Sequence, residues 1–405
     1  MNCIELSLAD TCEFINGGAW SDKEYVEAGI PVVKVTNMVD GTIETNNLSY
    51  LPLSSSDKYK KHLLFVNDLV VTTVGSHPTQ PGSVVGRTSV VPQHFDGAFL
   101  NQNAVCIRVK CKNLISPKFL IYISKTILFK HHIESRARGS ANQVRMALGE
   151  LKKFTFKFPP LPVQKKIAAI LSAYDDLIEN NNRRIAILEK MAEEIYREWF
   201  VRLRFPGHEQ VKFNKGIPES WERKRFDEFC LLQRGYDLPD TQVIPGQYPV
   251  IASTSIKTYH NQFKVNPPVI TTGRSGSLGI ILFINSQAWP LNTTLFVKNF
   301  YGNSPYLIYY TLKFLKLENF NSGAGVPTLN RNHLGGLYMS VPPKSLQNNF
   351  NDKIAILFKQ KELLSKSKNA LIEIRDRLLT RLISGKLSVE DLDIQFPPSM
   401  TEELK

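Results

Sequence analysis

The sequence lacks most of the features that mark secreted, zinc-binding or membrane proteins. It has five cysteines in 405 residues, and no two of them form a C-x-x-C pair. This odd number argues against a disulfide framework or a zinc cage and favours a reducing compartment, so we expect a cytoplasmic protein. The N-terminus, MNCIELSLAD, has no basic region before an apolar run, and no segment reaches the ~18 apolar residues of a membrane span.

Motifs of nucleotide and metal chemistry are also missing. The glycine-rich stretch 273–279 lacks the G-K-[ST] that cradles phosphates. The sequence NPPV that begins at Asn266 is similar to the N-P-P-aromatic motif of adenine methyltransferases, but Val269 cannot stack on a flipped base. The eight histidines form no H-x-x-x-H pair, and no E-x-K follows Asp240. We therefore expect no catalytic residue, no metal site and no cofactor in this chain.

Acidic residues are scarce in two separate segments, although the first hundred residues hold 11 acidic and 6 basic ones. Residues 101–160 contain 2 acidic and 12 basic side chains, and residues 241–340 contain 1 acidic and 7 basic ones. The whole chain carries a formal charge of +13. A soluble surface usually mixes both signs, so two acid-poor segments favour two contacts with an anionic partner, most commonly nucleic acid.

The chain repeats itself once. Six short matches occur in the same order in both halves, with offsets that shrink from 218 to 183 residues. They begin at Gly29 and Gln247, at Val70 and Val269, at Leu100 and Leu291, at Ser116 and Ser304, at Phe158 and Val341, and at Gln164 and Gln347. This order indicates a diverged tandem repeat of two α/β domains. Each copy opens with short β-type runs, such as 30–36 and 250–255. A helix is expected after each Ser-Pro, at 117–133 and 305–317.

A long stretch follows each copy, at 162–202 and 345–384, and after Pro162 no glycine or proline interrupts either one. Apolar positions recur in alternating steps of four and three, which predicts a heptad seam. We expect the two helices to pack on each other as an antiparallel coiled coil, although each could instead pack on its own domain. The seam of the first helix comprises Ile167, Leu171, Tyr174, Ile178, Asn181, Ile185, Leu188, Ile195 and Trp199. The seam of the second comprises Phe350, Ile354, Leu357, Leu364, Leu371, Leu378 and Leu382.

Both helices resemble the conserved regions of a known protein family. The stretch PPLPVQKKIAAIL from Pro159 and the stretch LIENNNRRI from Leu177 are similar to the central conserved region of type I restriction-modification specificity subunits. The segment from Pro342 through RLLTRLISG at Arg377 is similar to their distal conserved region. The sequence has Val163 where the family usually has glutamate. The order of domains and helices also matches.

The resemblance implies a non-catalytic subunit that reads a bipartite DNA target, with one domain per half-site. Two methyltransferase subunits would bind the helices, and translocating nuclease subunits would join them. S-adenosylmethionine, ATP and magnesium would belong to those partners. Alternatives are a stand-alone N6-adenine DNA methyltransferase, a nuclease, or a coiled-coil scaffold that does not bind DNA. The expected parts are recognition domains at 1–158 and 206–341, long helices at 159–205 and 342–385, and a tail at 386–405.

Candidate DNA contacts are polar and basic residues in the loops of each copy, because such side chains read base edges and phosphates. In the first domain they are Thr72, Ser76, His77, Gln80, Gln102, Asn103, Arg136, Arg138, Asn142, Gln143 and Arg145. In the second domain they are Lys257, Tyr259, Thr272, Arg274, Ser275, Asn292, Thr293, Asn330 and Arg331.

Overall fold

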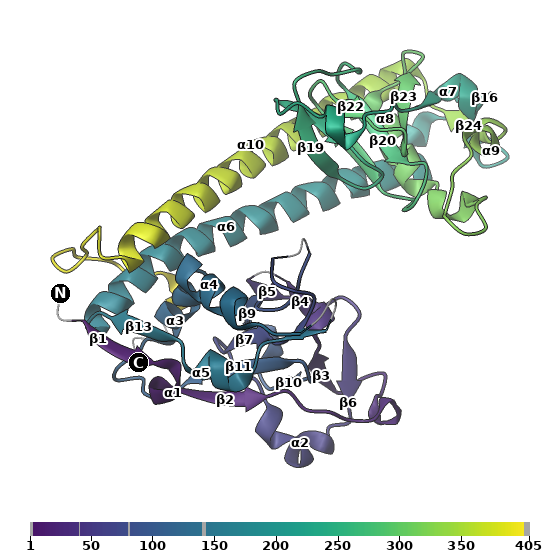
Figure 1. Ribbon diagram of the computed structural model, residues 1–405. Coiled ribbons are helices and arrows are strands. Elements are labelled where there is room, and N and C mark those ends of the chain that lie inside the picture. The colour runs from purple at the N-terminus through teal and green to yellow at the C-terminus, as the bar shows by residue number, and fades with distance from the viewer. Residues whose placement is uncertain (1–2, 40, 80–81, 140–142, 401–405) are drawn as a thin grey trace. The chain divides into compact units, whose positions relative to one another are not determined.

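The computed structural model describes residues 3–39, 41–79, 82–139 and 143–400, and it consists of two compact units (Figure 1). The first unit contains residues 1–180 and 368–405, and the second contains residues 181–367. Each unit therefore holds one copy of the repeat together with part of both long helices. These helices are α6 (Leu161–Tyr196), which continues as a π-helical turn over Arg197–Val201, and α10 (Lys344–Ile383).

A four-stranded antiparallel sheet in the order β2-β11-β7-β9 forms the centre of the first unit. A separate three-stranded sheet has the order β10-β3-β6. Strands β1 and β13, which come from the two ends of the copy, pair with each other. The strands are β1 (Ile4–Ser7), β2 (Cys12–Asn16), β3 (Ile30–Val33), β4 (Met38–Val39), β5 (Thr42–Ile43), β6 (Ser49–Leu51), β7 (Leu69–Thr72), β8 (Val74–Gly75), β9 (Thr88–Val90), β10 (Phe99–Leu100), β11 (Ala104–Val109), β12 (Val144–Arg145) and β13 (Thr155–Phe158). The helices are α1 (Leu8–Thr11), α2 (Ser55–Lys58), α3 (Pro117–Ser124), α4 (Ile127–Arg136) and α5 (Leu148–Lys152).

The second unit repeats the main sheets of this topology. Its four-stranded sheet has the order β17-β23-β20-β21, its three-stranded sheet has the order β19-β18-β22, and β16 pairs with β24. The elements are β14 (Phe213–Asn214), β15 (Ile217–Pro218), β16 (Glu222–Arg225), α7 (Phe226–Phe229), β17 (Leu231–Arg234), β18 (Tyr248–Ile251), β19 (Ile256–His260), β20 (Val269–Gly273), β21 (Ile281–Ile284), β22 (Trp289–Pro290), β23 (Thr294–Asn299), α8 (Pro305–Phe314), α9 (Arg331–Gly335) and β24 (Tyr338–Val341).

A buried glutamine at the start of each long helix fastens the helix to its domain. The Gln164 side chain accepts a hydrogen bond from the Ser116 amide at 3.1 Å and donates to the carbonyls of Leu114 and Pro159. Gln347 accepts from the Ser304 amide at 2.9 Å and donates to the Pro342 carbonyl. A buried amide needs all of these partners, so the clamp fixes where each helix begins.

The helix expected at 117–133 is interrupted, which corrects the sequence prediction. It ends after Ser124 and restarts as α4, because the Thr126 side chain accepts a hydrogen bond from the Phe129 amide and so caps a new helix. The corresponding helix in the second unit, α8, ends at Phe314, and a short 3₁₀ turn follows at Leu317–Phe320. Both α3 and α8 begin with a serine cap followed by proline, as the sequence predicted.

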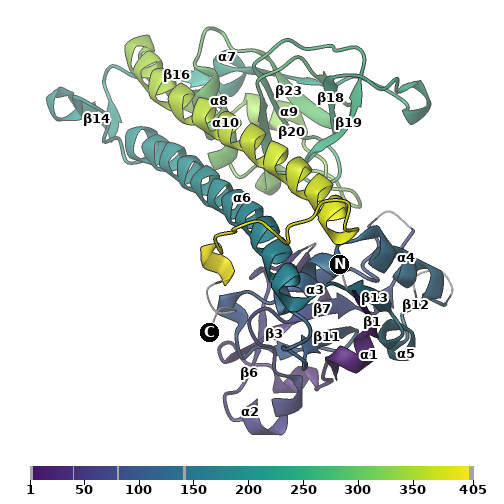
Figure 2. The same ribbon diagram turned by 90° about the vertical axis from the view of Figure 1, so that its left-hand side faces the viewer.

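The long helices run antiparallel and pack on each other within each unit (Figures 1 and 2). In the first unit Arg375 of α10 pairs with Asp175 of α6. In the second unit Asn181 donates to the Ser367 hydroxyl at 3.3 Å, and Glu189 pairs with Lys361. Every residue of both predicted seams is buried or partly buried. The predicted fold class, two tandem α/β domains with two antiparallel helices forming a coiled coil, is therefore confirmed.

The C-terminal segment packs into the core of the first unit. Val389 is 1% exposed and Met400 is completely buried, and both belong to the same apolar cluster as Ile167 and Leu171 of α6. The Lys166 amine donates to the Glu390 carbonyl at 2.6 Å, where the segment crosses α6 (Figure 2). The part of the predicted tail that the structure describes, 386–400, is thus a component of the first core.

Candidate DNA interface

Three segments that are distant in the sequence meet at one end of the first domain's sheet. The Thr73 amide donates to the Asn103 carbonyl at 2.8 Å, and the Met146 amide donates to the Thr73 carbonyl at 2.8 Å. Arg138 and Arg145 exchange two backbone hydrogen bonds, so they close a hairpin that pairs with β8. The structure therefore brings together three of the loops that the sequence proposed for DNA contact.

The second domain has the same arrangement. The Arg274 amide donates to the Thr293 carbonyl at 2.8 Å, and the Leu329 amide donates to the Arg274 carbonyl at 2.8 Å. The Ser322 amide donates to the Thr328 carbonyl, which closes the equivalent hairpin. Both domains thus present a strand end, a loop before the next strand, and a hairpin as one surface.

These hydrogen bonds give the true correspondence between the copies, and it differs from the sequence matches. Thr73 corresponds to Arg274, because each amide contacts the residue before the next strand. Asn101 corresponds to Leu291, since the two amides bond to equivalent carbonyls in β3 and β18. The sequence had instead paired Asn101 with Asn292. The local Leu-Asn match is therefore out of register by one residue, and only the hydrogen bonds between strands reveal this.

The structure exposes most of the candidate contacts in the first domain but not all of them. Gln102, Asn103, Arg138, Gln143 and Arg145 are exposed. Ser76, His77 and Arg136 are partly exposed. Gln80 and Asn142 lie outside the described residues. Thr72 is completely buried, and its hydroxyl donates to the Val84 carbonyl.

The three candidate arginines of the first domain have different surroundings. Arg136 lies 3.5 Å from the Glu150 carboxylate and donates to the Ser135 hydroxyl. The Arg138 guanidinium donates to the carbonyls of Ser135 and Ala137, and these two hydrogen bonds stabilise the base of the hairpin. The Arg145 side chain has no hydrogen-bond partner among the described residues. Arg145 is therefore the guanidinium most available to an external phosphate or base.

In the second domain several candidate side chains also stabilise the loops. The Arg274 guanidinium donates to the Asn292 carbonyl at 2.9 Å, and the Asn292 amide donates to Asp237. Lys257 on β19 pairs with Asp240 at 2.6 Å, and Tyr259 on the same strand is exposed.

The remaining second-domain candidates divide between exposed and buried positions. Asn330 and Arg331 are exposed, while Ser275 and Thr293 are partly exposed. Thr272 is 1% exposed, and its hydroxyl has no partner in the described part of the chain.

Sequence reasoning missed residues that shape both surfaces. A Cβ on Gly17 would lie 1.8 Å from the Asn101 carbonyl oxygen, and one on Gly235 would lie 2.2 Å from the Leu291 oxygen. These glycines are structurally equivalent, because their amides donate to the carbonyls of Ala104 and Thr294, the first residues of β11 and β23. The repeated glycine after β2 and β17 was the available signal. Arg234, just before Gly235, is also exposed and donates to the Asn292 carbonyl.

Groups with catalytic potential are buried or dispersed. Burial raises the pKa of the Cys12 thiol to about 11 and that of the Cys230 thiol to about 12, so neither forms a thiolate nucleophile near neutral pH. Within the described ranges, no three His, Cys, Asp or Glu side chains gather where they could hold a metal ion. No helix in the described part of the chain is long and apolar enough to cross a membrane.

Comparison with known proteins identifies the family. The family model for the type I restriction modification DNA specificity domain matches residues 5–190 and 218–373, once for each copy. The type I restriction enzyme MjaIX specificity subunit of Methanocaldococcus jannaschii is 26% identical over 311 residues, covering 69% of this chain and 71% of that protein. The putative MjaX specificity subunit of the same organism is 22% identical over 95% of this chain and 93% of its own length.

A solved structure supports the same fold. The type I restriction-modification system S subunit from M. genitalium aligns with a TM-score of 0.59 and 18% identity, over 94% of this chain and 96% of that chain. The family model covers most of the sequence in two blocks that coincide with the two copies of the repeat. The chain therefore belongs to the type I restriction-modification DNA specificity family and is a non-catalytic specificity subunit of such a system.

Proposed function

We propose that each domain reads one half of a bipartite target in double-stranded DNA through its three-segment surface. The recognition domains would comprise residues 1–158 and 206–341. The observation that carries this proposal is that the two acid-poor segments found in the sequence supply the hairpin and loop of the two equivalent surfaces. A surface with more basic than acidic side chains attracts phosphates, and exposed polar side chains on it can reach base edges.

The two surfaces share a backbone frame but differ in side chains, as two readers of different sequences should. At the hairpin base, Arg138 and Arg145 of the first domain correspond to Ser322 and Thr328 of the second. Arginine commonly reads guanine, whereas serine and threonine contact bases or phosphates less selectively. We therefore infer that the half-sites differ in sequence.

The helix pair would bind the partner subunits. Besides the seam, α6 and α10 carry exposed apolar side chains, each 45% to 59% exposed: Leu177, Ile187, Met191, Ile356, Leu363 and Ile374. Apolar side chains that remain exposed on a packed helix pair are typical of a surface that another protein covers. We propose that two methyltransferase subunits bind there and that nuclease subunits join them. These partners would supply S-adenosylmethionine, ATP and magnesium.

The proposal is tested by replacing Arg145 with alanine in the chain assembled with its methyltransferase partner. We expect weaker DNA binding and a salt slope lower by about one, because one phosphate or base contact is lost. Affinity would be measured by fluorescence anisotropy at several salt concentrations, on a duplex containing the methylated motif found by adenine-methylation sequencing.

Lys153→Ala is the control, since this exposed lysine of the same domain pairs with Glu150 and is not a candidate DNA contact. We expect it to leave the salt slope nearly unchanged. If Arg145→Ala binds as tightly as the wild type at every salt concentration, the hairpin is not part of the DNA interface. If the assembled complex methylates no bipartite motif, the proposed function as a whole is wrong.

A further inference from the structure

A polar cluster fastens the first domain to the helix pair. The Tyr122 hydroxyl of α3 donates to the Asp175 carboxylate of α6 at 2.7 Å and lies 3.0 Å from the Ser172 hydroxyl. Arg375 of α10 donates to the other oxygen of Asp175 at 2.6 Å. The Lys125 amine is 3.6 Å from the same carboxylate. One aspartate thus connects the domain's helix and both helices of the pair.

Burial and the charge on Asp175 restrict the geometry of the hydrogen bonds in this cluster. Tyr122 is 2% exposed and Ser172 is 2% exposed, while the Arg375 side chain is 18% exposed. Burial alone would raise the pKa of Asp175, but the charge of Lys125 and the hydrogen bonds from Arg375 and Tyr122 outweigh it and lower that pKa. Asp175 therefore stays ionised and accepts from several donors at once. Charge-assisted hydrogen bonds of this kind constrain both distance and angle.

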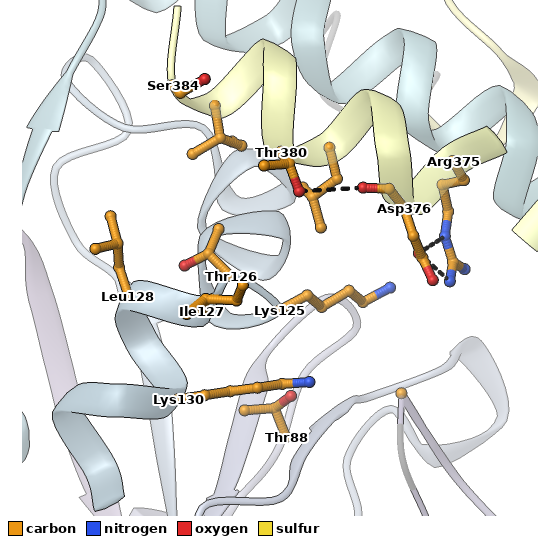
Figure 3. A pocket seen from close by; sticks show the side chains of 13 residues that line it. Thr88, Lys125, Thr126, Ile127, Leu128, Lys130, Arg375, Asp376, Thr380 and Ser384 are labelled. Carbon is orange, nitrogen blue, oxygen red and sulfur yellow. Dashed lines mark hydrogen bonds and ion pairs between the residues drawn. The ribbon is translucent and has the colours of Figure 1, made fainter. Parts of the chain in front are cut away.

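The end of α10 buries Leu379 and Leu382 in the core of the first unit, but a gap remains beside them. A cavity of about 490 Å³ lies between the start of α4 and the last turns of α10 (Figure 3). Ile127 and Leu128 line it from α4, and Thr380 and Ser384 line it from α10. Ile127 is 77% exposed. Apolar packing therefore holds the domain against both helices, and the cluster around Asp175 adds directional contacts beside this gap.

In the second unit, aromatic side chains occupy the positions of this cluster, and Lys313 of α8 pairs with Glu193 of α6 nearby. Tyr310 corresponds to Tyr122 and Phe358 corresponds to Asp175, counted from the equivalent serine and glutamine clamps. The Tyr310 ring stacks on Tyr196 at 5.5 Å, and Phe358 packs on Tyr306 at 4.8 Å. The Tyr310 hydroxyl has no hydrogen-bond partner among the residues that the structure describes. The two joints thus differ in chemistry at this position, which is polar in the first unit and aromatic in the second.

We propose that Tyr122, Asp175 and Arg375 are positioning residues, which set the orientation of the first recognition domain on the helix pair and with it the distance at which its half-site is read. The second domain has no carboxylate at the position of Asp175, where Phe358 packs on Tyr306. This inference rests on the proposed function, because it names the residues that fix half-site spacing. Apolar contacts are non-directional and tolerate small rotations, whereas losing one of a few hydrogen bonds leaves a rotational freedom that the open cavity permits.

The test uses Tyr122→Phe and Arg375→Gln in the full chain. Tyr122→Phe removes only a hydroxyl, so the domain core is retained. Each variant is assembled with its methyltransferase partner, and methylated adenines are sequenced in a library of random DNA. We expect unchanged half-site sequences and a broader distribution of gap lengths, with the preference for the best gap over gaps one base pair away reduced about fivefold. Hydrogen exchange of the α3 amides should accelerate by a similar factor.

Two matched controls separate the joint from general effects. Tyr310→Phe changes the equivalent tyrosine of the second domain, and Arg377→Gln breaks an exposed pair with Glu373 on the same helix. Both should keep the wild-type gap distribution. Unchanged gaps in Tyr122→Phe and Arg375→Gln would overturn the inference, even if exchange in α3 accelerates. A wild-type complex that methylates no bipartite motif would overturn the proposed function and, through it, this inference.

Discussion

The role of each arginine depends on the carbonyls and carboxylates around it more than on its place in a basic segment. The guanidinium groups of Arg138 and Arg274 both donate to backbone carbonyls. Each arginine therefore stabilises the loop from which we expected it to extend toward DNA. Arg145, on the same hairpin as Arg138, has none of these contacts among the described residues. Two neighbouring arginines therefore divide the tasks of supporting a surface and presenting charge on it.

Glycine has an equally local role at Gly235, where a strand passes close to a carbonyl. We expect Gly235→Ala to destabilise the second unit by about 2 kcal/mol or more, because the new Cβ would overlap the backbone oxygens of Pro290 and Leu291. Urea unfolding followed by tryptophan fluorescence measures this change. Gly336→Ala is the control, since a Cβ there meets no atom within 4 Å. Equal midpoints for the two variants would show that the close approach relaxes at little cost.

Among the elements, the long helices combine an apolar seam with a few polar positions. Asn181 is 8% exposed in the seam and bonds to Ser367, so its amide keeps a partner inside the helix pair. Polar seam residues of this kind commonly fix register at some cost in stability.

The segment after α10 is held by apolar burial. It buries Val389 and Met400 in the first core and thereby ties the last residues of the described chain to its first domain.

This packing makes the first unit sensitive to changes near the C-terminus. We expect Met400→Ala to lower the free energy of unfolding of the first unit by about 3 kcal/mol, because a completely buried side chain leaves a cavity. Leu392→Ala is the control on the same segment, since Leu392 is 49% exposed. Hydrogen exchange resolved by segment measures both. If amides of the first domain exchange at the wild-type rate in Met400→Ala, the segment does not support the core.

At the scale of the whole molecule, order and periodicity were predictable from the sequence, whereas contacts were not. Six ordered matches revealed the repeat, and the steps of four and three placed the seam on the buried face. The break between α3 and α4 depends on the Thr126 cap, which competes with continuing the helix, and no periodicity reveals it. The burial of Thr72 and the register of Asn101 depend on strand pairing across distant segments. Those long-range hydrogen bonds leave no local signature.

Because α6 and α10 each run from one unit into the other, their length should determine the distance between half-sites. We therefore expect one heptad inserted into both helices, after Asn181 and before Ser367, to add about 10 Å of helix, which corresponds to about three base pairs. A whole heptad in each helix preserves the seam, whereas an insertion in α6 alone breaks its register with α10. The half-site sequences should stay the same in the paired insertion, since no loop of either domain changes.

Three base pairs also turn the second half-site by about 100° around the DNA axis, so we expect reduced affinity together with the longer gap. Methylation sequencing of the assembled complex measures both quantities, and the single insertion, which should lose methylation altogether, is the control. An unchanged gap in the paired insertion would mean that the helices do not act as a spacer.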